Sequence, residues 1–524
     1  MGKFKESRAN ITVFGALLRA RREFGGRKIA LLDADDRELS YNDMIKASFA
    51  LGSALKAQTD KNEKVGILLP TGAGSLLAFF ALSAAGRIPA MLNFTAGVHN
   101  LKAAFKAAEI RKVVTAKRFI KLAQLEPLIE KLSERVDFIY LEDVQKSISL
   151  KNKLAALFGM LAPGLVMARP SYKKPAVILF TSGTEGDPKG VALSHKNLVA
   201  NCEQVRAHID ELYPETDVVF NPLPTFHCFG LTGGALLPLF AGMKVALYPS
   251  PLHVKEIPKR IEKVGTTIMF ATDTFLARYA RSSKGDELKG LRFAVCGAEQ
   301  VKDETRNFVR KKFDMQILEG YGATEAAPVI AVNQPTANRP GTVGHFLPGE
   351  EYRLDPVPGI EKGGRLYVRG PNVMMGYITT ENPGVIQPPK DGWHDTGDIV
   401  EVDEDGYVSI RGRVKRFANI GGETVSLAVV ENCANAVWPD FEHVALIRPD
   451  PKKGEQIVLL SSCAEANRND LRSWAQNHGV SELALPRQIV YVPEIPLLGT
   501  GKVDYNGAAR LMEKTLNAPS DNSA

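Results

Sequence analysis

The chain has 524 residues, of which 44% are hydrophobic and 24% are charged, and its formal net charge is +7. This composition is typical of a globular protein large enough for two or more domains, and no tract of six like charges indicates a nucleic-acid-binding arm. Five widely spaced cysteines without a Cys-x-x-Cys pair predict neither a disulfide framework nor a zinc site, which favours a reducing, cytoplasmic compartment. The mild positive charge suits an anionic partner such as a nucleotide, an acidic carrier protein or a phospholipid surface.

The N-terminal part of the chain contains no segment that we expect to cross a bilayer. The apolar run Ile11–Leu18 is too short for a membrane span and lacks a cleavage site. Farther along, two lysines precede apolar residues at helical spacing: Lys151, Lys153, Leu154, Leu157, Phe158 and Leu161. Such a helix can make a peripheral contact with a membrane surface, or it can pack on the body of the protein between two lobes. The sequence leaves both alternatives open.

A phosphate-binding loop is predicted directly after the apolar run Ala176–Phe180, which is typical of a short buried strand. The loop has the sequence Thr181-Ser182-Gly183-Thr184-Glu185-Gly186-Asp187-Pro188-Lys189-Gly190. Its glycines let backbone N–H groups turn toward phosphate oxygens, its hydroxyls add donors, and Lys189 supplies a positive charge. The spacing differs from that of the Walker A loop. The alternative is a flexible surface turn.

This ten-residue pattern resembles the signature of adenylate-forming enzymes, the superfamily of acyl-CoA synthetases, luciferases and peptide-synthetase adenylation domains. The resemblance implies ATP and Mg²⁺ as cofactors. It also implies a cradle for the triphosphate made by Thr181, Ser182, Gly183, Thr184, Gly186 and Lys189. The implied fold is α/β, with a large N-terminal domain of mainly parallel sheets flanked by helices and a small α+β C-terminal domain.

Short β-rich runs alternate with helical patterns from Pro175 to Tyr321, which predicts a mainly parallel sheet with helices on its faces. Ser194 should cap a helix whose apolar residues recur at helical spacing. Further strands are expected at 217–221, 244–248, 266–271, 291–296 and 316–318. Further helices are expected at 231–240, 254–264, from about 274, and at 301–313.

Three loops that follow strand ends should converge at one edge of this sheet, namely the phosphate loop, Cys296–Glu299 and Glu319–Glu325. In the superfamily that the chain resembles, the turn like Gly297-Ala298-Glu299 lines the adenine pocket. The tyrosine like Tyr321, which precedes Gly322, stacks on the base. Thr324 resembles the residue that contacts the α-phosphate, and Glu325 resembles the carboxylate that holds Mg²⁺. Taken alone, Glu325 could be an exposed acid at the start of a helix.

A second group of nucleotide contacts is implied nearer the C-terminus. The segment Trp393–Asp398 resembles the Thr-Gly-Asp motif, whose aspartate accepts hydrogen bonds from the ribose hydroxyls. Two β-rich runs, 399–402 and 407–410, flank an Asp-Gly turn and predict a hairpin. Arg413 matches a second ribose or phosphate contact, while Asp398 could instead pair with a neighbour such as Arg411.

The stretch from Gly412 to Phe417 resembles the hinge between the two domains of the superfamily, with Lys415 as the residue that absorbs the rotation. The resemblance therefore implies an N-terminal adenylation domain at 1–413 and a mobile C-terminal domain at 414–524. In the second domain, Gly422 matches the close approach to the pantetheine arm. Lys502 matches the catalytic lysine that stabilises charge during adenylation.

His227 resembles the aromatic gate of the acyl pocket, and its alternative is a packed core histidine. Apolar side chains surround it in the sequence, namely Phe226, Phe229, Leu231 and Leu236. An apolar lining suits an aliphatic tail better than an amino acid, whose ammonium group would need a buried carboxylate. We therefore expect a fatty-acid tunnel.

Four further stretches resemble the synthetase half of the bifunctional bacterial acyltransferase/acyl-carrier-protein synthetase: 248–253, 317–322, 358–366 and 415–418. The resemblance implies a fatty acid and acyl carrier protein as partners, and peripheral location on the inner face of the bacterial membrane. None of the nine histidines is followed by the His-x4-Asp spacing of the acyltransferase half, so a separate lysophospholipid acyltransferase would be needed. Lys302, Arg306 and Arg310 could form a basic stripe for the acidic carrier or a solvated helix face.

Two other functions remain open at this point. A fatty acyl-CoA synthetase would use the same residues with coenzyme A as the acceptor. A non-catalytic nucleotide- or acyl-binding subunit would retain the fold without the reaction.

Overall fold

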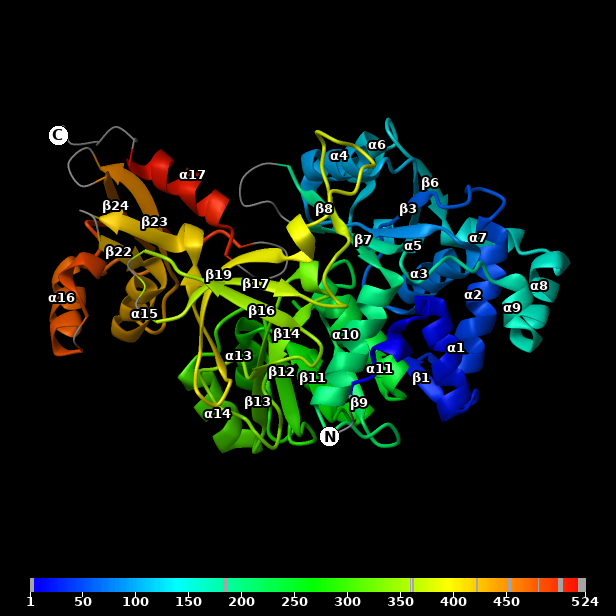
Figure 1. Cartoon of the computed structure of the whole chain (residues 1–524), viewed down its shortest axis with the longest axis horizontal. Coiled ribbons are helices and arrows are strands. Elements are labelled where there is room, and N and C mark those ends of the chain that lie inside the picture. The colour runs from blue at the N-terminus through cyan, green and yellow to red at the C-terminus, as the bar shows by residue number, and fades with distance from the viewer. Residues whose placement is uncertain are drawn as a thin grey trace. The chain divides into compact units, whose positions relative to one another are not determined.

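The computed structural model describes residues 4–181, 187–358, 360, 362–420, 423–450, 454–478, 480–497 and 503–516. The chain forms two compact units. Unit 1 comprises residues 1–351 and 368–394, and unit 2 comprises residues 352–367 and 395–524. Figure 1 traces the chain through the helices and strands of each unit.

The larger sheet of unit 1 has nine strands among the described residues. Its order is β15 (His345–Phe346), β14 (Val329–Val332), β13 (Gln316–Gly322), β12 (Phe293–Cys296), β11 (Ile268–Ala271), β9 (Val218–Asn221), β10 (Lys244–Leu247), β1 (Ile29–Leu32) and β2 (Glu38–Ser40). The strands from β13 to β1 pair in parallel, and the remaining pairs are antiparallel. This mixed pairing is common where helices cover a doubly wound sheet.

The second sheet of unit 1 has seven strands within the described ranges. Its order is β18 (Gly376–Ile378), β8 (Lys189–Ser194), β7 (Pro175–Thr181), β4 (Ile88–Met91), β3 (Lys64–Ile67), β5 (Lys112–Thr115) and β6 (Asp137–Tyr140). β7 and β8 form an antiparallel pair in which Thr181 lies opposite Lys189. The loop between these two residues therefore joins two strands of one hairpin.

The helices of unit 1 connect and cover these sheets. They are η1 (Glu6–Ala9), α1 (Val13–Phe24), α2 (Tyr41–Leu55), α3 (Ala73–Ala85), α4 (Gly97–Ala108), α5 (Lys117–Leu122), α6 (Glu126–Leu132), α7 (Leu141–Ser147), α8 (Leu150–Leu161), α9 (Pro163–Val166), α10 (His195–His208), the π-helix η2 (Phe229–Leu236), α11 (Leu237–Ala241), α12 (Ile257–Val264), α13 (Asp273–Ser282), α14 (Asp303–Phe313), η3 (Thr324–Ala326) and η4 (Lys390–Gly392). One hydrophobic core joins both sheets, with Phe79 of α3, Val177 of β7 and Phe220 of β9 all fully buried. None of the described helices combines the length and the apolar character needed to cross a bilayer.

Helix α10 lies in this core and begins as the sequence predicts. The Ser194 hydroxyl accepts a hydrogen bond from Asn197 N–H, and the Asn197 side chain accepts one from Ser194 N–H, so both residues form a capping box. The buried amide of Asn197 also donates to the carbonyls of Pro371 and Val373. These bonds satisfy polar groups that would otherwise be costly to bury.

The predicted single sheet is wrong, because the strand before the phosphate loop lies in the seven-stranded sheet whereas β12 and β13 lie in the nine-stranded one. Local pattern cannot say which strands pair, since pairing is decided by contacts between distant segments. The predicted strand at 316–318 also continues to Gly322, and the first part of the helix expected at 231–240 is the π-helix η2.

Unit 2 contains two sheets. The first has the order β16 (Glu351–Asp355), β17 (Gly364–Arg369), β19 (His394–Val402) and β20 (Val408–Arg413). The second contains β22 (Glu423–Ser426), β21 (Phe417–Ile420), β24 (Gly454–Ser461), β23 (His443–Asp450) and β25 (Gln488–Tyr491). The helices are η5 (Val414–Arg416), α15 (Leu427–Val437), α16 (Arg468–Asn477), η6 (Glu482–Ala484) and α17 (Tyr505–Leu516). The hairpin predicted around the Asp-Gly turn is confirmed by the pairing of β19 with β20.

His195 at the start of α10 predicts a loss of stability in acid. Burial lowers its pKa from 6.5 to about 4, and its Nδ1 accepts a hydrogen bond from Val13 N–H. As the pH falls below 6.5, the unfolded chain binds a proton that the folded chain does not bind. The free energy of unfolding should therefore decrease between pH 6.5 and 4, by about 3 kcal/mol at the lower end.

Chemical denaturation at pH 7 and pH 4.5 measures this effect. A His195→Asn variant keeps an acceptor near Val13 but does not titrate, so its stability should depend less on pH than that of the wild type. His253→Asn, which replaces an exposed histidine, should follow the wild-type curve. Equal pH dependence in the wild type and His195→Asn would contradict the assignment.

Candidate active site

Lys189 and Glu325 meet at one aromatic side chain in unit 1, that of Tyr377. The Tyr377 hydroxyl donates a hydrogen bond to Glu325 Oε1 at 2.6 Å. The Lys189 ammonium lies over the Tyr377 ring, with Nζ 5.2 Å from the centroid, which is a cation–π distance. Lys189 begins β8, Tyr377 lies on the neighbouring edge strand β18, and Glu325 belongs to η3. The structure thus brings together a cation and a carboxylate that are 136 positions apart in the sequence.

Sequence reasoning missed Tyr377. A usable signal was present, because Gly376–Ile378 is a short β-type run, but nothing local indicates that it pairs with β8. The backbone reinforces the arrangement, since Met374 N–H donates to the Glu325 carbonyl at 2.7 Å. Tyr377 is therefore a positioning residue for the Glu325 carboxylate.

Several predicted residues fall outside the described part of the chain. They are Ser182, Gly183, Thr184 and Gly186 of the phosphate loop, Gly422 and Lys502. The two ends of the loop are described: Thr181 ends β7 and Lys189 begins β8. The roles of the loop residues remain predictions.

The turn Gly297-Ala298-Glu299 follows β12 and is fixed to the start of α13. The Glu299 carboxylate accepts hydrogen bonds from Thr274 N–H at 3.0 Å and from the Thr274 hydroxyl at 2.8 Å. Ala298 has a φ of 73°, which is unusual for a residue other than glycine. A Cβ on Gly297 would lie 3.4 Å from the Gly320 carbonyl oxygen, so the turn runs close to β13.

The next strand, β13, ends with Tyr321 and Gly322, and Thr324 and Glu325 follow it in η3. Tyr321 is half-buried near the end of β13, where it pairs with Ala331 of β14. A side chain at Gly322 would collide with the Pro328 carbonyl oxygen, so this position needs glycine. Thr324 and Glu325 begin η3 and are half-buried. The turn after β12 and the end of β13 therefore lie side by side, as expected for neighbouring parallel strands.

His227 lies just before the π-helix η2. It is half-buried, and its Nδ1 accepts a hydrogen bond from Phe229 N–H at 3.4 Å. The Phe229 ring packs edge-on against Phe270 at 5.5 Å and also lies beside the backbone of Gly297. Of the other predicted lining residues, Phe226 packs on Phe94, while Leu231 and Leu236 are fully buried in the core. An apolar environment thus adjoins the turn after β12.

Asp398 and Arg413 form an ion pair in unit 2, with Arg413 Nε 2.9 Å from Asp398 Oδ1. The two residues are direct partners in the β19–β20 ladder. Arg411, the alternative partner, pairs with Glu401 instead. The pair brings a carboxylate and a guanidinium to one end of the hairpin.

Lys415 lies in η5 between two anchored arginines. Arg413 on one side pairs with Asp398. Arg416 on the other side donates to Glu431 at 2.6 Å and stacks on Tyr505, with its guanidinium carbon 4.1 Å from the ring centroid. A residue between two fixed points is suited to absorb a rotation. The hinge and the division at residue 414 remain predictions.

The expected basic stripe on α14 differs in the structure. The Arg306 side chain is 14% exposed and its Nη2 lies 3.1 Å from Glu319 Oε2. Burial raises the pKa of the Glu319 carboxyl, while the Arg306 charge and a hydrogen bond from Gly341 N–H act in the opposite direction. Arg306 is therefore part of a partly buried ion pair rather than of a solvated face.

The family model described as "AMP-binding enzyme" matches residues 18–378. The chain belongs to this family. Its curated relatives include a "Probable 4-coumarate--CoA ligase 1" of Dictyostelium discoideum, 31% identical over 345 residues, which are 63% of this chain and 62% of that protein. A "Long-chain-fatty-acid--CoA ligase" of Salmonella typhimurium is 29% identical over 354 residues, 64% of this chain and 62% of the relative.

A longer match is to a mitochondrial medium-chain acyl-CoA ligase of Bos taurus, 26% identical over 497 residues, 87% of this chain and 80% of that one. For the Dictyostelium discoideum and Salmonella typhimurium ligases, the chain spans less than two thirds of the relative's length. Among solved structures, an anthranilate CoA ligase in complex with anthranoyl-AMP has a TM-score of 0.80 at 22% identity, covering 98% of this chain and 99% of that one. An O-succinylbenzoate CoA synthetase from Bacillus subtilis in complex with ATP and magnesium has a TM-score of 0.79 at 21% identity, covering 94% and 98%. These likenesses confirm the predicted fold class.

Proposed function

We propose that this protein activates a fatty acid with ATP and Mg²⁺ through an acyl-adenylate and transfers the acyl group to the phosphopantetheine thiol of acyl carrier protein. The observation that carries the proposal is the meeting of Lys189 and Glu325 at Tyr377. The apolar side chains that follow His227 support an aliphatic substrate. The match to the AMP-binding enzyme model also supports the proposal, since the matched region, residues 18–378, contains Lys189, Glu325 and Tyr377.

Glu325 is suited to a magnesium ion bound together with a nucleotide. The described residues contain no group of three or more His, Cys, Asp or Glu side chains that could hold a metal alone. One carboxylate plus phosphate oxygens and water is a typical ligand set for Mg²⁺, and Glu325 and Thr324 offer oxygen donors of the required kind. When bound, Mg²⁺ would neutralise charge on the phosphates.

In the first step, a fatty carboxylate oxygen attacks the α-phosphorus of ATP and pyrophosphate leaves. Lys189 and Thr324 stabilise negative charge on the phosphates, and Lys502 stabilises charge on the carboxylate and the α-phosphate. Asp398 and Arg413 hold the ribose or a phosphate. The turn Gly297-Ala298-Glu299, Tyr321 and Gly322 hold the adenine.

In the second step, the C-terminal domain turns at Lys415, which withdraws Lys502 and admits the pantetheine arm past Gly422. The thiol attacks the acyl carbonyl carbon, and AMP leaves. An acyl-adenylate is a mixed anhydride that water hydrolyses, so its enclosure between the two steps matters. His227 gates the acyl pocket.

The second candidate is a fatty acyl-CoA ligase, which the names of the curated relatives favour. Both reactions use the same residues and differ only in the thiol. The deciding experiment is ATP-dependent thioester formation with a panel of fatty acids, offering holo-acyl carrier protein and coenzyme A in parallel. Thioester on the carrier protein alone supports the proposal, whereas thioester on coenzyme A alone overturns this acceptor and leaves fatty-acid activation intact.

We place the reaction in the cytoplasm, where a separate lysophospholipid acyltransferase would consume the acyl carrier thioester. The four stretches that resemble the bacterial acyl-carrier-protein synthetase support this role. A co-purified or co-expressed acyltransferase should re-acylate lysophospholipid only when this protein, ATP and fatty acid are all present.

Tyr377→Phe should reduce fatty-acid-dependent ATP–pyrophosphate exchange by about tenfold, because it removes a hydrogen bond to a charged group while keeping the ring. The Mg²⁺ concentration that gives half-maximal exchange should increase, since Glu325 would no longer be held in place. Tyr140→Phe is a matched control: Tyr140 also lies under a lysine, Lys117, at 5.2 Å, but on β6 at the opposite edge of the same sheet. An unchanged Mg²⁺ dependence in Tyr377→Phe would contradict the positioning role.

A further inference from the structure

We propose that the outer face of α8 and α9 docks on an anionic phospholipid bilayer. This surface, which we call the leucine face, consists of Leu150, Leu154, Leu157, Phe158, Leu161 and Leu165. These side chains are between 44% and 85% exposed. A cluster of large exposed apolar side chains on neighbouring turns indicates an interaction surface.

The spacing of these residues places them on one side of α8. Leu150, Leu154, Leu157 and Leu161 follow one another at intervals of four, three and four residues, which forms a stripe along the helix at about 100° per residue. Phe158 borders this stripe on one side. Lys151 projects beyond Phe158 and Lys153 beyond Leu157, so a basic residue flanks each side of the stripe. Both lysines are exposed.

The opposite face of α8 is already used for packing on α2. Ala156 and Gly159 are buried, and a Cβ on Gly159 would lie 2.5 Å from the Phe49 ring of α2. The Asn152 amide donates to the Ser53 hydroxyl of α2 at 2.9 Å. Figure 1 shows α8 and α9 beside α2. The helix therefore packs on the body through its small residues and presents its leucines outward. The sequence allowed α8 either to pack on the body or to contact a membrane, and its two faces can do one each.

The charge of the surrounding segment indicates which partner docks on the leucine face. From Val144 to Phe180 the sequence contains no Asp or Glu, and it contains six basic residues: Lys146, Lys151, Lys153, Arg169, Lys173 and Lys174. All six are exposed. A segment that carries leucines on its outer face and whose own charged side chains are all positive is complementary to a bilayer with anionic headgroups. A second copy of this chain would bring the same positive charges together.

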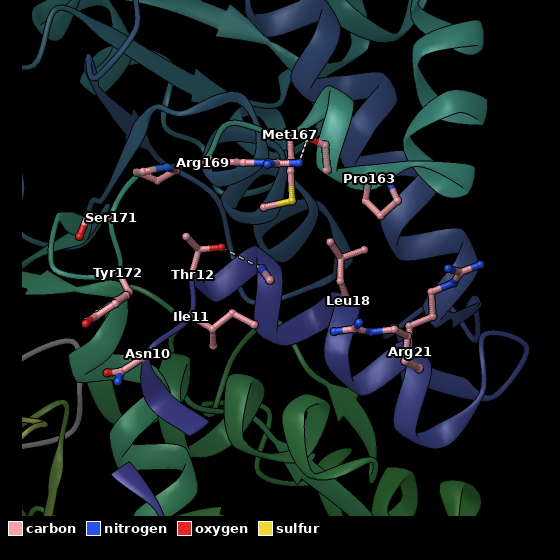
Figure 2. Close-up of a pocket in the computed structure, with 14 residues that line it drawn as sticks. Asn10, Ile11, Thr12, Leu18, Arg21, Pro163, Met167, Arg169, Ser171 and Tyr172 are labelled. Atoms are coloured by element: carbon pink, nitrogen blue, oxygen red, sulfur yellow. Dashed lines mark hydrogen bonds between the residues drawn. The ribbon is translucent and has the colours of Figure 1, made fainter. Parts of the chain in front are cut away.

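A cavity of about 500 Å³ adjoins the same segment and adds further cationic groups. Its lining comes from residues 10–22 and 163–172, and includes Arg21, Arg22 and Arg169. Figure 2 shows Leu18 and Arg21 of α1 on one side of this cavity and Pro163, Met167 and Arg169 on the α9 side. Arginines suit phosphate groups, and apolar walls suit the glycerol and acyl parts of a lipid. The cavity would accordingly receive the headgroup of a docked phospholipid.

Co-sedimentation of the full chain with vesicles tests the docking without substrates, so its outcome is independent of the proposed reaction. The wild type should bind vesicles that contain phosphatidylglycerol and bind pure phosphatidylcholine vesicles at least about tenfold more weakly, with a decrease in binding as salt is raised. A Leu157→Ser/Leu161→Ser variant should lose at least about tenfold in binding. Lys151→Gln/Lys153→Gln should bind more weakly and with less salt dependence.

The chain offers matched controls. Leu122 and Val385 are 73% and 57% exposed, close to the 76% and 53% of Leu161 and Leu157, so Leu122→Ser/Val385→Ser should bind like the wild type. Lys61→Gln/Lys284→Gln removes two exposed lysines from other parts of unit 1 and should also bind normally. Thermal unfolding of each variant shows that it is folded.

Three results would overturn the proposal. The first is wild-type protein that does not bind phosphatidylglycerol vesicles. The second is equal loss of binding in the leucine variant and its control. The third is a dimer, measured by analytical ultracentrifugation, that the leucine variant alone abolishes while vesicle binding is unaffected, because a second copy would then cover the leucine face.

Discussion

Glu325→Gln should reduce fatty-acid-dependent ATP–pyrophosphate exchange by about 100-fold or more, because an amide keeps the size of the side chain but loses the charge that would hold Mg²⁺. The fold should persist, since the Tyr377 hydroxyl can donate to the amide oxygen as it donates to Glu325 Oε1 at 2.6 Å. Exchange measured over a range of Mg²⁺ concentrations checks this prediction. Increased Mg²⁺ should restore part of the activity only if some metal binding remains.

Glu256→Gln is the control, because Glu256 pairs with Lys259 at 3.0 Å at the start of α12 and belongs to the same unit. It should exchange pyrophosphate like the wild type. If Glu325→Gln shows the same exchange rate and the same Mg²⁺ dependence as the wild type, Glu325 does not bind the metal.

Lys502→Ala should reduce adenylation by about 100-fold or more while keeping most of the thioester transfer from supplied acyl-adenylate. In the proposed mechanism this lysine acts only in the first of two domain orientations, so the second step should proceed without it. Pyrophosphate exchange measures the first step, and thioester formation from synthetic acyl-adenylate measures the second. Lys514→Ala, which removes an exposed lysine of α17, should leave both steps unchanged.

Equal loss of adenylation and of transfer in Lys502→Ala would contradict the two-orientation model. A Lys415→Pro variant, which would stiffen the proposed hinge, should lose thioester transfer more than adenylation.

Local sequence predicts much of the fold, because short strands and capped helices are specified by nearby residues. The strand expected at 244–248 is β10, and Ser194 caps α10 as predicted. Sheet membership could not be predicted, because β7 and β12 have similar apolar patterns yet pair with different partners. The pairing of Asp398 with Arg413 rather than with Arg411 depends on the register of the β19–β20 hairpin, which shifts between Ile399 and Val400.

The candidate site was predicted from motifs, and its geometry was not. Lys189 and Glu325 are 136 positions apart in the sequence, and only the pairing of β18 with β8 brings Tyr377 between them. Arg306 is a residue whose position the sequence did not predict correctly. Helical spacing places it on a basic stripe, but its side chain forms an ion pair with Glu319 and is mostly buried. The direction of a long side chain depends on tertiary partners that spacing does not include.

ATP–pyrophosphate exchange with saturated fatty acids from C8 to C18 tests the central claim most directly. We predict exchange that requires both Mg²⁺ and a fatty acid and that is about 100-fold or more weaker in Glu325→Gln. Complete absence of exchange in folded wild-type protein with every acid of the panel would contradict the claim, and would instead support a nucleotide- or acyl-binding protein without catalytic activity.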